Sequence, residues 1–431
     1  MLSWIKEKLN SCKVVLKNEG LFKLIKIIFG LIYMKITNTF MYSYSKSKYK
    51  KQLKQILNSE QYDRIVLWRS GFGWNVTLFQ RPQHIARELS NLGCLFFYEA
   101  SPYSDMDVKG LKKVKDKLYL VNLKVPAMSD ALHEVLKETD KAKYLQIYST
   151  EEEMTVEMLK QYESDGFKIL YEYIDDLNPD ISVKKELPKN IVDKYNYAMQ
   201  NPHILVVVTA TELENDVLSK RGNMNYVYSG NGVDVSHFLK TTSKDVSFND
   251  EFMKVLKSGK KMIGYYGALA KWFDYDLIRH FSENNPDINV VLIGKIYDDS
   301  FEKSGINNLS NVFYIGPVHY DDLPEYAKKF DVCTIPFLVN ELTNATSPLK
   351  LFEYMAMEKP IVTTAMLECK KYQSVLIANT YDEFSQHVQN FVNNEISEEY
   401  IDLLKKEADE NNWASKAKLM VDLMRKNEEN K

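Results

Sequence analysis

The sequence predicts an α/β protein with two parallel β-sheets, each covered by helices on both faces. From residue 64 onward, short apolar runs rich in β-branched and aromatic residues alternate with longer amphipathic segments. The runs are almost continuously apolar, which is typical of strands that are buried on both faces of a parallel sheet. A length of 431 residues allows two or three domains, each with a core of its own, and excludes a single small module.

Five apolar runs are expected to form the first sheet, and five more the second. The first set is 64–68, 94–98, 144–148, 168–171 and 204–208, and the second is 262–266, 290–293, 312–315, 332–335 and 360–363. Because a polar stretch separates the two sets, we expect an N-terminal domain over 59–238, a C-terminal domain over 239–410, and a last helix over 411–431 that crosses back to the first domain. Two doubly wound sheets in series are expected to face a cleft, where ligands bind beyond the carboxyl ends of the strands.

Charge sets residues 1–58 apart from the rest of the chain. They carry twelve Lys and two Glu, a balance of +10, and since the whole chain carries −3, the remaining residues carry −13. The apolar and basic residues predict an amphipathic helix, with Lys6, Lys13 and Lys17 on its solvent-facing side. Two partners stay open for its apolar face: an anionic membrane surface, which the further lysines between 46 and 54 favour, or the protein itself. Nucleic acid is disfavoured because the rest of the chain is acidic and the sequence has only seven Arg.

Two further features bear on location. The apolar run 27–34 is too short to cross a bilayer, and lysines interrupt any secretory signal. The four cysteines are spread over the chain without a CxxC pair, which is typical of a reducing compartment. We therefore expect a cytoplasmic protein that is peripheral on the inner face of the cytoplasmic membrane.

A helix that begins near Ser347 is the strongest candidate for a binding site. Ser347 is expected to be the N-cap and Pro348 to occupy the first helical position. Lys350 then lies in the first turn, where the helix dipole disfavours a cation unless an anion such as phosphate is bound there. Glu353 shares a face with Lys350, so an exposed Lys–Glu pair is the alternative interpretation.

The run 347–364 resembles the donor-binding signature of GT-B glycosyltransferases of family 4. Other segments resemble the family in the same order along the chain: 80–84, 171–176, 231–234, 264–269 with 272–274, and 315–318. The resemblance covers roughly residues 64–425 and leaves out the basic extension. It implies two Rossmann-like domains facing a cleft, a nucleotide sugar as substrate, no cofactor and no metal ion.

The resemblance also implies roles for residues of the C-terminal domain. Glu353 is similar to the glutamate that hydrogen-bonds the ribose of the nucleotide sugar, and Lys350 is expected to offset charge on the departing nucleoside diphosphate. Ser347 and the amides of Leu349 and Lys350 are expected to hold the diphosphate. The other expected donor-binding residues are Gly267 near the phosphates, and Ile315, Gly316 and Val318 near the nucleobase.

The sequence departs from the family pattern at three places. The first of two family glutamates falls at Ala345, so Asn344 or Thr346 is the candidate for its sugar contact. The arginine after the first strand of the C-terminal domain is absent, and Lys271 is the candidate catalytic substitute. The N-terminal domain lacks the family's glycine-rich opening, and the segment 70–74 is the candidate replacement.

Two carboxylates are candidates for catalysis on the acceptor side. Asp175 and Asp176 follow a predicted strand and are expected to orient the acceptor hydroxyl or to stabilise an oxocarbenium-like centre, with a turn or helix-cap role as the alternative. The expected acceptor-side residues are Gly73, Trp74, Arg81 and His84, and for His84 packing is the favoured interpretation. Two motifs are expected to be structural: a capping box that begins at Thr211, and Asp274 at a helix start.

Together these features predict a retaining glycosyltransferase that moves a hexose from a nucleotide sugar to a lipid-linked or polysaccharide acceptor in surface glycan synthesis. Two alternatives stay open. The missing glutamate and arginine would fit a GT-B scaffold that has lost catalysis and serves as a sugar-binding partner subunit. A sugar-nucleotide epimerase on the same fold would form product without an acceptor.

Overall fold

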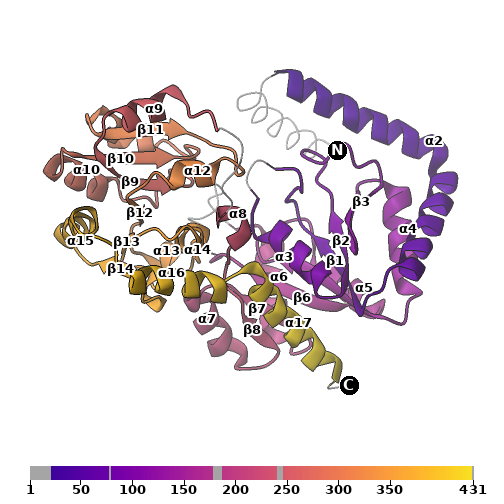
Figure 1. The fold of residues 1–431 in the computed structure, drawn as a ribbon. Helices are drawn as coiled ribbons and strands as arrows, with labels where there is room; N and C mark the ends of the chain where they lie inside the picture. Colours follow the sequence, from indigo (N-terminus) through magenta and orange to yellow (C-terminus); the bar gives the residue numbers. More distant parts are fainter. Residues whose placement is uncertain (1–20, 77–78, 178–186, 240–245, 430–431) are drawn as a thin grey trace. The chain divides into compact units, whose positions relative to one another are not determined.

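The computed structural model describes residues 21–76, 79–177, 187–239 and 246–429, except for the side chains of Leu24 and of residues 31–41. It is an α/β structure with two sheets, one of eight strands and one of six (Figure 1). The chain divides into two compact units, the first formed by 1–76 with 86–170 and the second by 77–85 with 171–431. The predicted fold class of two parallel Rossmann-like sheets is confirmed, whereas the boundary near residue 239 stays a prediction.

The first unit contains a five-strand array in the order β3-β4-β2-β1-β5. Its strands are β1 (Arg64–Arg69), β2 (Cys94–Glu99), β3 (Leu111–Lys115), β4 (Leu118–Val121) and β5 (Ala142–Tyr148). All neighbours are parallel except β3 and β4, which form an antiparallel hairpin. The lysine-rich β3 did not match the pattern of a buried strand, and the structure places it with exposed residues at the edge of the array.

The helices of the first unit include a long one that was expected from its basic amphipathic sequence. They are α2 (Leu21–Ser59), α4 (Pro126–Lys137) and α5 (Val156–Ser164), and α3 (Arg81–Asn91) has residues in both units. The second half of α2 lies along α4, where Lys46 and Lys54 form ion pairs with Glu134 and Glu138 (Figure 1). Lys6, Lys13 and Lys17 lie outside the described residues, and within the described part no helix has the length and apolarity needed to span a bilayer.

The second unit begins with strands that follow in the order β6-β7-β8. Their bounds are β6 (Lys168–Tyr173, which starts in the first unit), β7 (Leu205–Val208) and β8 (Tyr226–Tyr228). The helices between and after them are α6 (Lys189–Gln200), α7 (Thr211–Arg221) and α8 (Val235–Leu239). The last helix, α17 (Trp413–Glu429), packs on β7 and β8, and the hydroxyl of Ser229 donates to the carbonyl of Lys416 at 3.1 Å (Figure 1).

A parallel six-stranded sheet in the order β11-β10-β9-β12-β13-β14 forms the rest of the second unit. Its strands are β9 (Lys261–Tyr266), β10 (Ile288–Ile293), β11 (Val312–Gly316), β12 (Val332–Ile335), β13 (Ile361–Thr364) and β14 (Val375–Ala378). Its helices are α9 (Asp250–Lys257), α10 (Tyr275–Asn284), α11 (Ser300–Ser304), α12 (Leu323–Ala327), α13 (Glu341–Asn344), α14 (Leu349–Ala356), α15 (Tyr381–Asn393) and α16 (Glu398–Glu410). The apolar strand residues form one core with the inward faces of these helices.

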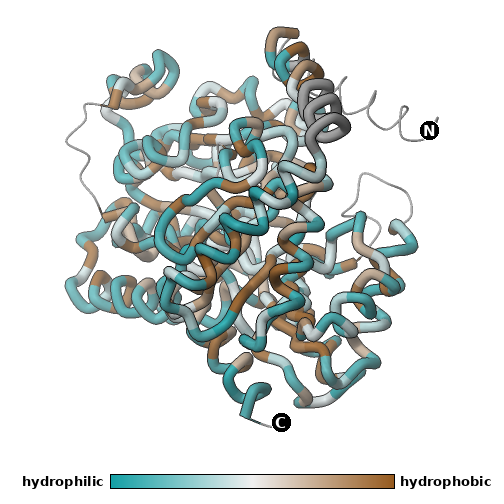
Figure 2. Tube along the Cα trace, turned by 90° about the vertical axis from the view of Figure 1, so that its right-hand side faces the viewer, coloured by the Kyte–Doolittle hydropathy of each residue, from teal (hydrophilic) through white to brown (hydrophobic). Residues whose placement is uncertain are grey.

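All ten predicted strands are present, and the pattern missed four others. β3, β4, β8 and β14 are three to five residues long and either polar or too short to show a period. Figure 2 shows hydrophobic segments running through the interior of the fold, with hydrophilic segments on many outer turns. In the six-stranded sheet, the carboxyl ends of the neighbouring strands β11, β10, β9 and β12 lie at one edge, and ligands of parallel α/β folds usually bind at this edge.

Candidate active site

Helix α14 begins one residue later than predicted. Its N-cap is Pro348, without a side-chain cap, so the prediction of Ser347 as the N-cap is wrong. The hydroxyl of Ser347 instead accepts a hydrogen bond from the backbone N–H of Asn231 at 3.2 Å, and the carbonyl of Ser347 accepts one from the Asn231 side chain at 2.7 Å. The segment 231–234 thus holds the chain just before the helix, and the first amides of α14, at Leu349 and Lys350, belong to the turn that has no partners within the helix.

Lys350 extends from the first turn of α14 alongside Gly267, which follows β9. A Cβ atom on Gly267 would stand 2.8 Å from the Cε atom of Lys350, and the φ angle of Gly267 is +147°, so a larger residue is excluded both by space and by backbone conformation. The Nζ atom lies 5.2 Å from the ring centroid of Tyr265 and 4.9 Å from that of Phe337. The cation is therefore held beside two aromatic rings, one of which comes from β9.

The loop of Gly267 is packed tightly against the loop that follows β10. The N–H of Gly267 donates to the carbonyl of Ile293 at 2.9 Å, and a Cβ atom on Gly294 would stand only 1.9 Å from the carbonyl oxygen of Gly267. The N–H of Gly294 in turn donates to the carbonyl of Gly316 at the end of β11, at 2.9 Å. These contacts fix the loops after three neighbouring strands at one edge of the sheet.

Glu353 lies one turn after Lys350 and is only 9% exposed, so the interpretation of an exposed surface pair is wrong. Burial raises the pKa of Glu353 to about 7, and the Tyr266 hydroxyl and the Lys350 cation offset part of this rise. Burial lowers the pKa of Lys350 to about 8, and the charge of Glu353 opposes this. The pair is therefore poised to change charge near neutral pH, which is typical of functional sites.

The three residues expected near a nucleobase lie at the end of β11 and just after it. The carbonyl of Ile315 accepts a hydrogen bond from the side chain of Asn249 at 2.9 Å, and the carbonyl of Gly316 accepts from Gly294. Gly316 has a φ angle of +84°, and Val318 is half-buried. Because a carbonyl oxygen has two lone pairs, both carbonyls can accept a second hydrogen bond from a ligand.

The candidate substitutes for the missing family residues have different surroundings. Lys271 is exposed in the loop after β9, and its backbone N–H donates to Asp298 at 3.0 Å. Asn344 accepts from the backbone N–H of Leu367 at 3.1 Å through its side-chain oxygen, and the Thr346 hydroxyl donates to a backbone carbonyl at 3.0 Å. Ala345 itself is buried, at 2% exposure. Both polar candidates at 344 and 346 therefore already have a partner in the protein.

A pocket of about 520 Å³ lies next to this segment in the second unit. It is lined by Tyr173, Asp176, Leu177, Tyr195, Glu212, Leu213, Asp216, Lys220, Glu341, Asn344 and Ala345. Four of these side chains are carboxylates, and one of them, Asp216, accepts a hydrogen bond from Tyr195 and lies 3.2 Å from Lys220. Asp176, a candidate catalytic residue, and Ala345, which stands at the position expected for a glutamate, thus line the same pocket.

Asp175 and Asp176 follow β6 and have unusual acidity. Burial, and next the negative charge of Asp176, raises the pKa of Asp175 to about 6. Burial, and next the charge of Asp216, raises the pKa of Asp176. A carboxylate with a raised pKa is suited to proton transfer near neutral pH, so the pair keeps its candidate role on the acceptor side.

Arg81 and His84 are buried at the start of α3. The Nε atom of Arg81 donates to Glu172, which is fully buried, at 2.8 Å, and its Nη1 atom donates to the carbonyl of Gly230 at 2.8 Å. His84 is 6% exposed and stacks on Trp413 with ring centroids 4.9 Å apart. Both side chains thus connect α3 to distant segments of the second unit, and for His84 this is the packing role that the sequence favoured.

Gly73 and Trp74 belong to the first unit. A Cβ atom on Gly73 would stand 1.6 Å from the hydroxyl oxygen of Ser104, so a larger residue there would require Ser104 to move. Trp74 is 8% exposed, and its backbone N–H donates to Asp105 at 2.8 Å. The replacement for the glycine-rich opening is therefore a closely packed loop.

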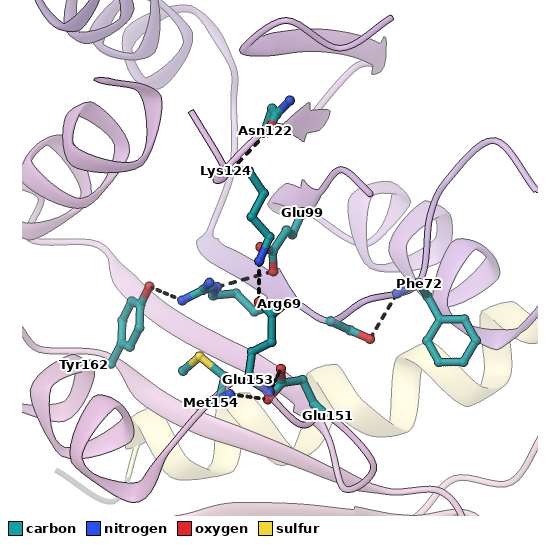
Figure 3. Close-up of polar contacts among 10 residues, drawn as sticks. Arg69, Phe72, Glu99, Asn122, Lys124, Glu151, Glu153, Met154 and Tyr162 are labelled. Carbon is teal, nitrogen blue, oxygen red and sulfur yellow. Dashed lines mark hydrogen bonds and ion pairs between the residues drawn. The ribbon is translucent and has the colours of Figure 1, made fainter. Parts of the chain in front are cut away.

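The same unit has a polar cluster that the sequence reasoning missed. Arg69 ends β1 and Glu99 ends β2, and Figure 3 shows Arg69 reaching between Glu99 and Tyr162, each at 3.4 Å. Phe72, which follows in the loop after β1, is 41% exposed. Arg69 and Glu99 could have been identified from the sequence, because each is a charged residue directly after an apolar run that was predicted to be a strand.

Two structural motifs turned out differently from each other. Asp274 is the N-cap of α10 and accepts from Leu277 at 2.9 Å, which confirms the capping interpretation. The prediction of a capping box at Thr211 is wrong because Thr211 is already the first residue of α7, whose N-cap is Ala210.

Glu368, from the loop after β13, holds the start of α7 instead. It accepts hydrogen bonds from both the backbone N–H and the hydroxyl of Thr211 at 2.7 Å. Its second oxygen accepts from the Tyr228 hydroxyl at 2.6 Å.

The fold is similar to that of solved glycosyltransferases. Sucrose-phosphate synthase from Thermosynechococcus elongatus matches with a TM-score of 0.60 at 13% identity, covering 84% of this chain and 98% of that one. Alr3699/HepE from Anabaena, solved in complex with UDP and glucose, matches with a TM-score of 0.56 at 14% identity, covering 84% of this chain and 99% of that one. The chain therefore has the GT-B fold.

The sequence comparisons match parts of the chain to known glycosyltransferases. Residues 260–394 match the family described as glycosyl transferases group 1, and they form a domain of that family. The putative teichuronic acid biosynthesis glycosyltransferase TuaH of Bacillus subtilis (strain 168) is 29% identical over 115 residues. This match spans 26% of the present chain and 28% of that relative. The matched family region contains Gly267, Ile315, Lys350 and Glu353.

Proposed function

We propose that the protein is a glycosyltransferase that moves a hexose from a nucleotide sugar to a glycan acceptor with retention of the anomeric configuration. The observation that carries this proposal is the position of Lys350, which lies in the first turn of α14 beside Gly267 and within the family region. A helix N-terminus with a cation in its first turn suits a diphosphate, because the amides and the charge act on the same anion. Glu353, one turn further on, is placed to accept a hydrogen bond from the ribose.

In the proposed reaction, the bond between the anomeric carbon and the diphosphate oxygen breaks as the acceptor oxygen bonds to that carbon. The acceptor proton passes to the leaving diphosphate. Lys350 and the amides of Leu349 and Lys350 stabilise the negative charge that develops on the leaving oxygen. Because this stabilisation grows as the bond breaks, it lowers the barrier and does not only increase donor affinity.

On the acceptor side, we assign Asp176 and its pocket to the acceptor hydroxyls. Carboxylates accept hydrogen bonds from hydroxyl groups, and the tyrosines of the pocket offer rings for a sugar face. The raised pKa of Asp175 and Asp176 favours a role for one of them in orienting the acceptor hydroxyl and carrying its proton on the way to the leaving diphosphate. Lys271, at the exposed end of the loop after β9, is a second candidate for the donor phosphates.

For the acceptor we propose a lipid-linked or polysaccharide chain of the cell surface, reached from the inner face of the cytoplasmic membrane. The printed name of the Bacillus subtilis relative, which refers to teichuronic acid biosynthesis, supports a surface polysaccharide. Binding of UDP and glucose by the Anabaena structure supports a UDP-sugar as the first donor to test.

A second candidate function is that of a sugar-binding subunit without catalysis. Ala345 stands where the family has a glutamate, and the side chains of Asn344 and Thr346 are already hydrogen-bonded within the protein. The donor sugar would then lack one of its usual contacts. The reaction assay distinguishes this candidate from the enzyme.

The experiment is to incubate the purified chain with a panel of UDP-, GDP- and ADP-hexoses, with and without a short glycolipid acceptor. Release of nucleoside diphosphate and transfer of labelled sugar are measured together. The glycosyltransferase proposal expects both, at a rate that depends on the acceptor. Donor binding by calorimetry without any turnover would identify the inactive subunit, and conversion of the donor sugar without acceptor would identify an epimerase.

A further inference from the structure

The first three turns of α2 expose a group of large apolar side chains. This apolar face of α2 consists of Leu21, Phe22, Ile25, Ile28 and Phe29, whose exposed fractions are 61%, 83%, 43%, 40% and 69%. The first turns of the helix are mostly hydrophobic in Figure 2, at the surface of the first unit. Five neighbouring exposed apolar side chains mark an interaction site, because single ones are common but groups are not.

The five residues lie on one side of the helix. At 100° per residue they fall within an arc of about 120°, with Phe22 and Ile28 at its edges. Ile27 lies roughly opposite the middle of this arc, and it is 4% exposed. The helix therefore turns Ile27 toward the protein and the apolar face away from it.

Among the described residues of α2, the charges beside the apolar face are of one sign. Lys26 is exposed and lies about 40° beyond Phe22, at the border of the face, whereas the exposed Lys23 lies about 160° from the middle of the face, on the side of Ile27. The sequence of α2 from Leu21 to Ser59 contains eight Lys and no acidic residue. An apolar face with a lysine border is the pattern of helices that lie in a membrane interface.

The other half of α2 is used differently. Lys46 lies 2.7 Å from Glu134, Lys50 lies 3.1 Å from Glu134, and Lys54 lies 2.8 Å from Glu138. Three of the five lysines between 46 and 54, which in the sequence appeared to extend a basic surface, are thus paired with carboxylates of α4. These ion pairs leave the first turns of α2 as the candidate membrane-binding surface. They also hold the second half of α2 against α4.

We propose that the apolar face of α2 docks on an anionic lipid bilayer, with the helix lying in the interface and Lys26 at the headgroups. This docking would hold the proposed glycosyltransferase at the membrane. Only the purpose of the docking rests on the proposed function, because binding to lipid can be measured without any transfer reaction. A second copy of the chain is a poorer partner, because pairing two such faces would bring their lysine borders together without any carboxylate of α2 to balance them. Near an anionic surface, each lysine contributes about fivefold to the binding constant.

The test is sedimentation of the full chain with vesicles of phosphatidylcholine alone or with phosphatidylglycerol added. Binding is expected with the anionic vesicles and is expected to weaken at high salt. The variant Phe22→Ser/Phe29→Ser should lower the partition coefficient at least about tenfold, since it removes the two most exposed rings. Its matched control is Leu218→Ser/Leu419→Ser, which changes two exposed apolar residues of α7 and α17 and should leave binding unchanged.

A second pair of variants tests the charge. Lys26→Gln should lower binding to anionic vesicles about fivefold at low salt, from the contribution of the one lysine at the border of the face. Lys51→Gln removes the same charge from an exposed position in the other half of the helix and should change binding less than about twofold, because the first turns make the contact.

Three results would overturn the proposal: no binding to anionic vesicles, equal loss in both members of a matched pair, or a dimer in solution that only Phe22→Ser/Phe29→Ser dissociates. The last result would assign the face to a second copy. Nucleoside diphosphate release with a soluble acceptor should be the same in all four variants, so a failure of docking and a failure of the proposed reaction can be told apart.

Discussion

The Cε atom of Lys350 lies 2.8 Å from the point where a Cβ atom would stand on Gly267. The two residues come from different parts of the same sheet edge, since Gly267 follows β9 and Lys350 lies in α14. The stem of the lysine therefore lies over the glycine backbone, and the position of its ammonium depends on that glycine having no side chain. This contact connects two segments that the sequence could only relate through a family resemblance.

Replacement of Gly267 by alanine should move Lys350 without removing it. We expect Gly267→Ala to lower the affinity for a nucleoside diphosphate at least about tenfold, measured by calorimetry, because the added methyl group displaces the cation by more than a hydrogen bond tolerates. The matched control is Gly259→Ala, where φ is +64° and no atom lies within 4 Å of the added methyl group. Lys350→Met separates the Lys350 contact from backbone strain at Gly267: adding Gly267→Ala to Lys350→Met should weaken binding no further, and a further loss of affinity would assign the effect to strain.

Donor binding should depend on pH in both directions. The pKa of Glu353 is raised to about 7 and that of Lys350 is lowered to about 8, both mainly by burial. Glu353 is therefore protonated below about pH 7, and Lys350 loses its charge above about pH 8, so affinity should be highest between these values and fall on either side. A titration of affinity against pH checks this. Glu353→Gln should remove the acid side of the profile and move the alkaline side to lower pH, because the charge of Glu353 raises the pKa of Lys350.

Asp176→Asn should separate the acceptor step from donor binding. Because the charge of Asp176 contributes to the raised pKa of Asp175, its removal should shift the acid limb of the transfer rate from near pH 6 to lower pH. We expect the transfer rate to fall about tenfold or more while the affinity for the nucleoside diphosphate changes little. The control is Glu214→Gln, a half-buried carboxylate of α7 that is not part of the pocket lining and accepts a hydrogen bond from Tyr226 at 3.2 Å. An equal loss in both variants would argue against a particular role for Asp176.

Glu368 is expected to matter for stability and not for chemistry. It is 1% exposed and accepts from Thr211 and Tyr228, so Glu368→Gln should lower the free energy of unfolding by about 1 to 3 kcal/mol through donors that lose their acceptor. Chemical denaturation measures this. Glu410→Gln, at an exposed residue 3.9 Å from Lys406, should change the free energy of unfolding by less than about 0.5 kcal/mol.

The sequence predicted most of the fold because its strands are long, apolar and separated by amphipathic helices. It also predicted Lys350 in a first turn, since a proline just before a periodic segment fixes where a helix begins. It could not predict that Ser347 binds Asn231, or that Glu368 caps α7, because these contacts join residues 116 and 157 positions apart and leave no local pattern.

For the basic extension, too, the sequence could not predict contacts between residues far apart in the chain. Composition showed that residues 1–58 are basic, but it could not show which lysines are neutralised. Lys46, Lys50 and Lys54 are paired because α4 presents Glu134 and Glu138 to α2, and that is a property of packing. The exposed apolar face at the start of the helix became a candidate surface only once those pairs were known.

The central claim is that Lys350 binds and stabilises the diphosphate of a nucleotide sugar, and a single comparison of two variants tests it most directly. Lys350→Met removes the cation from a buried position, and Lys295→Met removes an exposed lysine after β10. Because the folded protein lowers the pKa of Lys350 from 10.5 to about 8, its charge destabilises the fold below about pH 8, and Lys350→Met should raise the free energy of unfolding at pH 7 by about 3 kcal/mol. That gain should vanish toward about pH 10.5, where both states are neutral.

The measurement is nucleoside diphosphate release from the preferred donor, by the native chain and both variants. We predict a loss of at least about a hundredfold in Lys350→Met, with the native rate kept in Lys295→Met. Native turnover in a folded Lys350→Met would contradict the account.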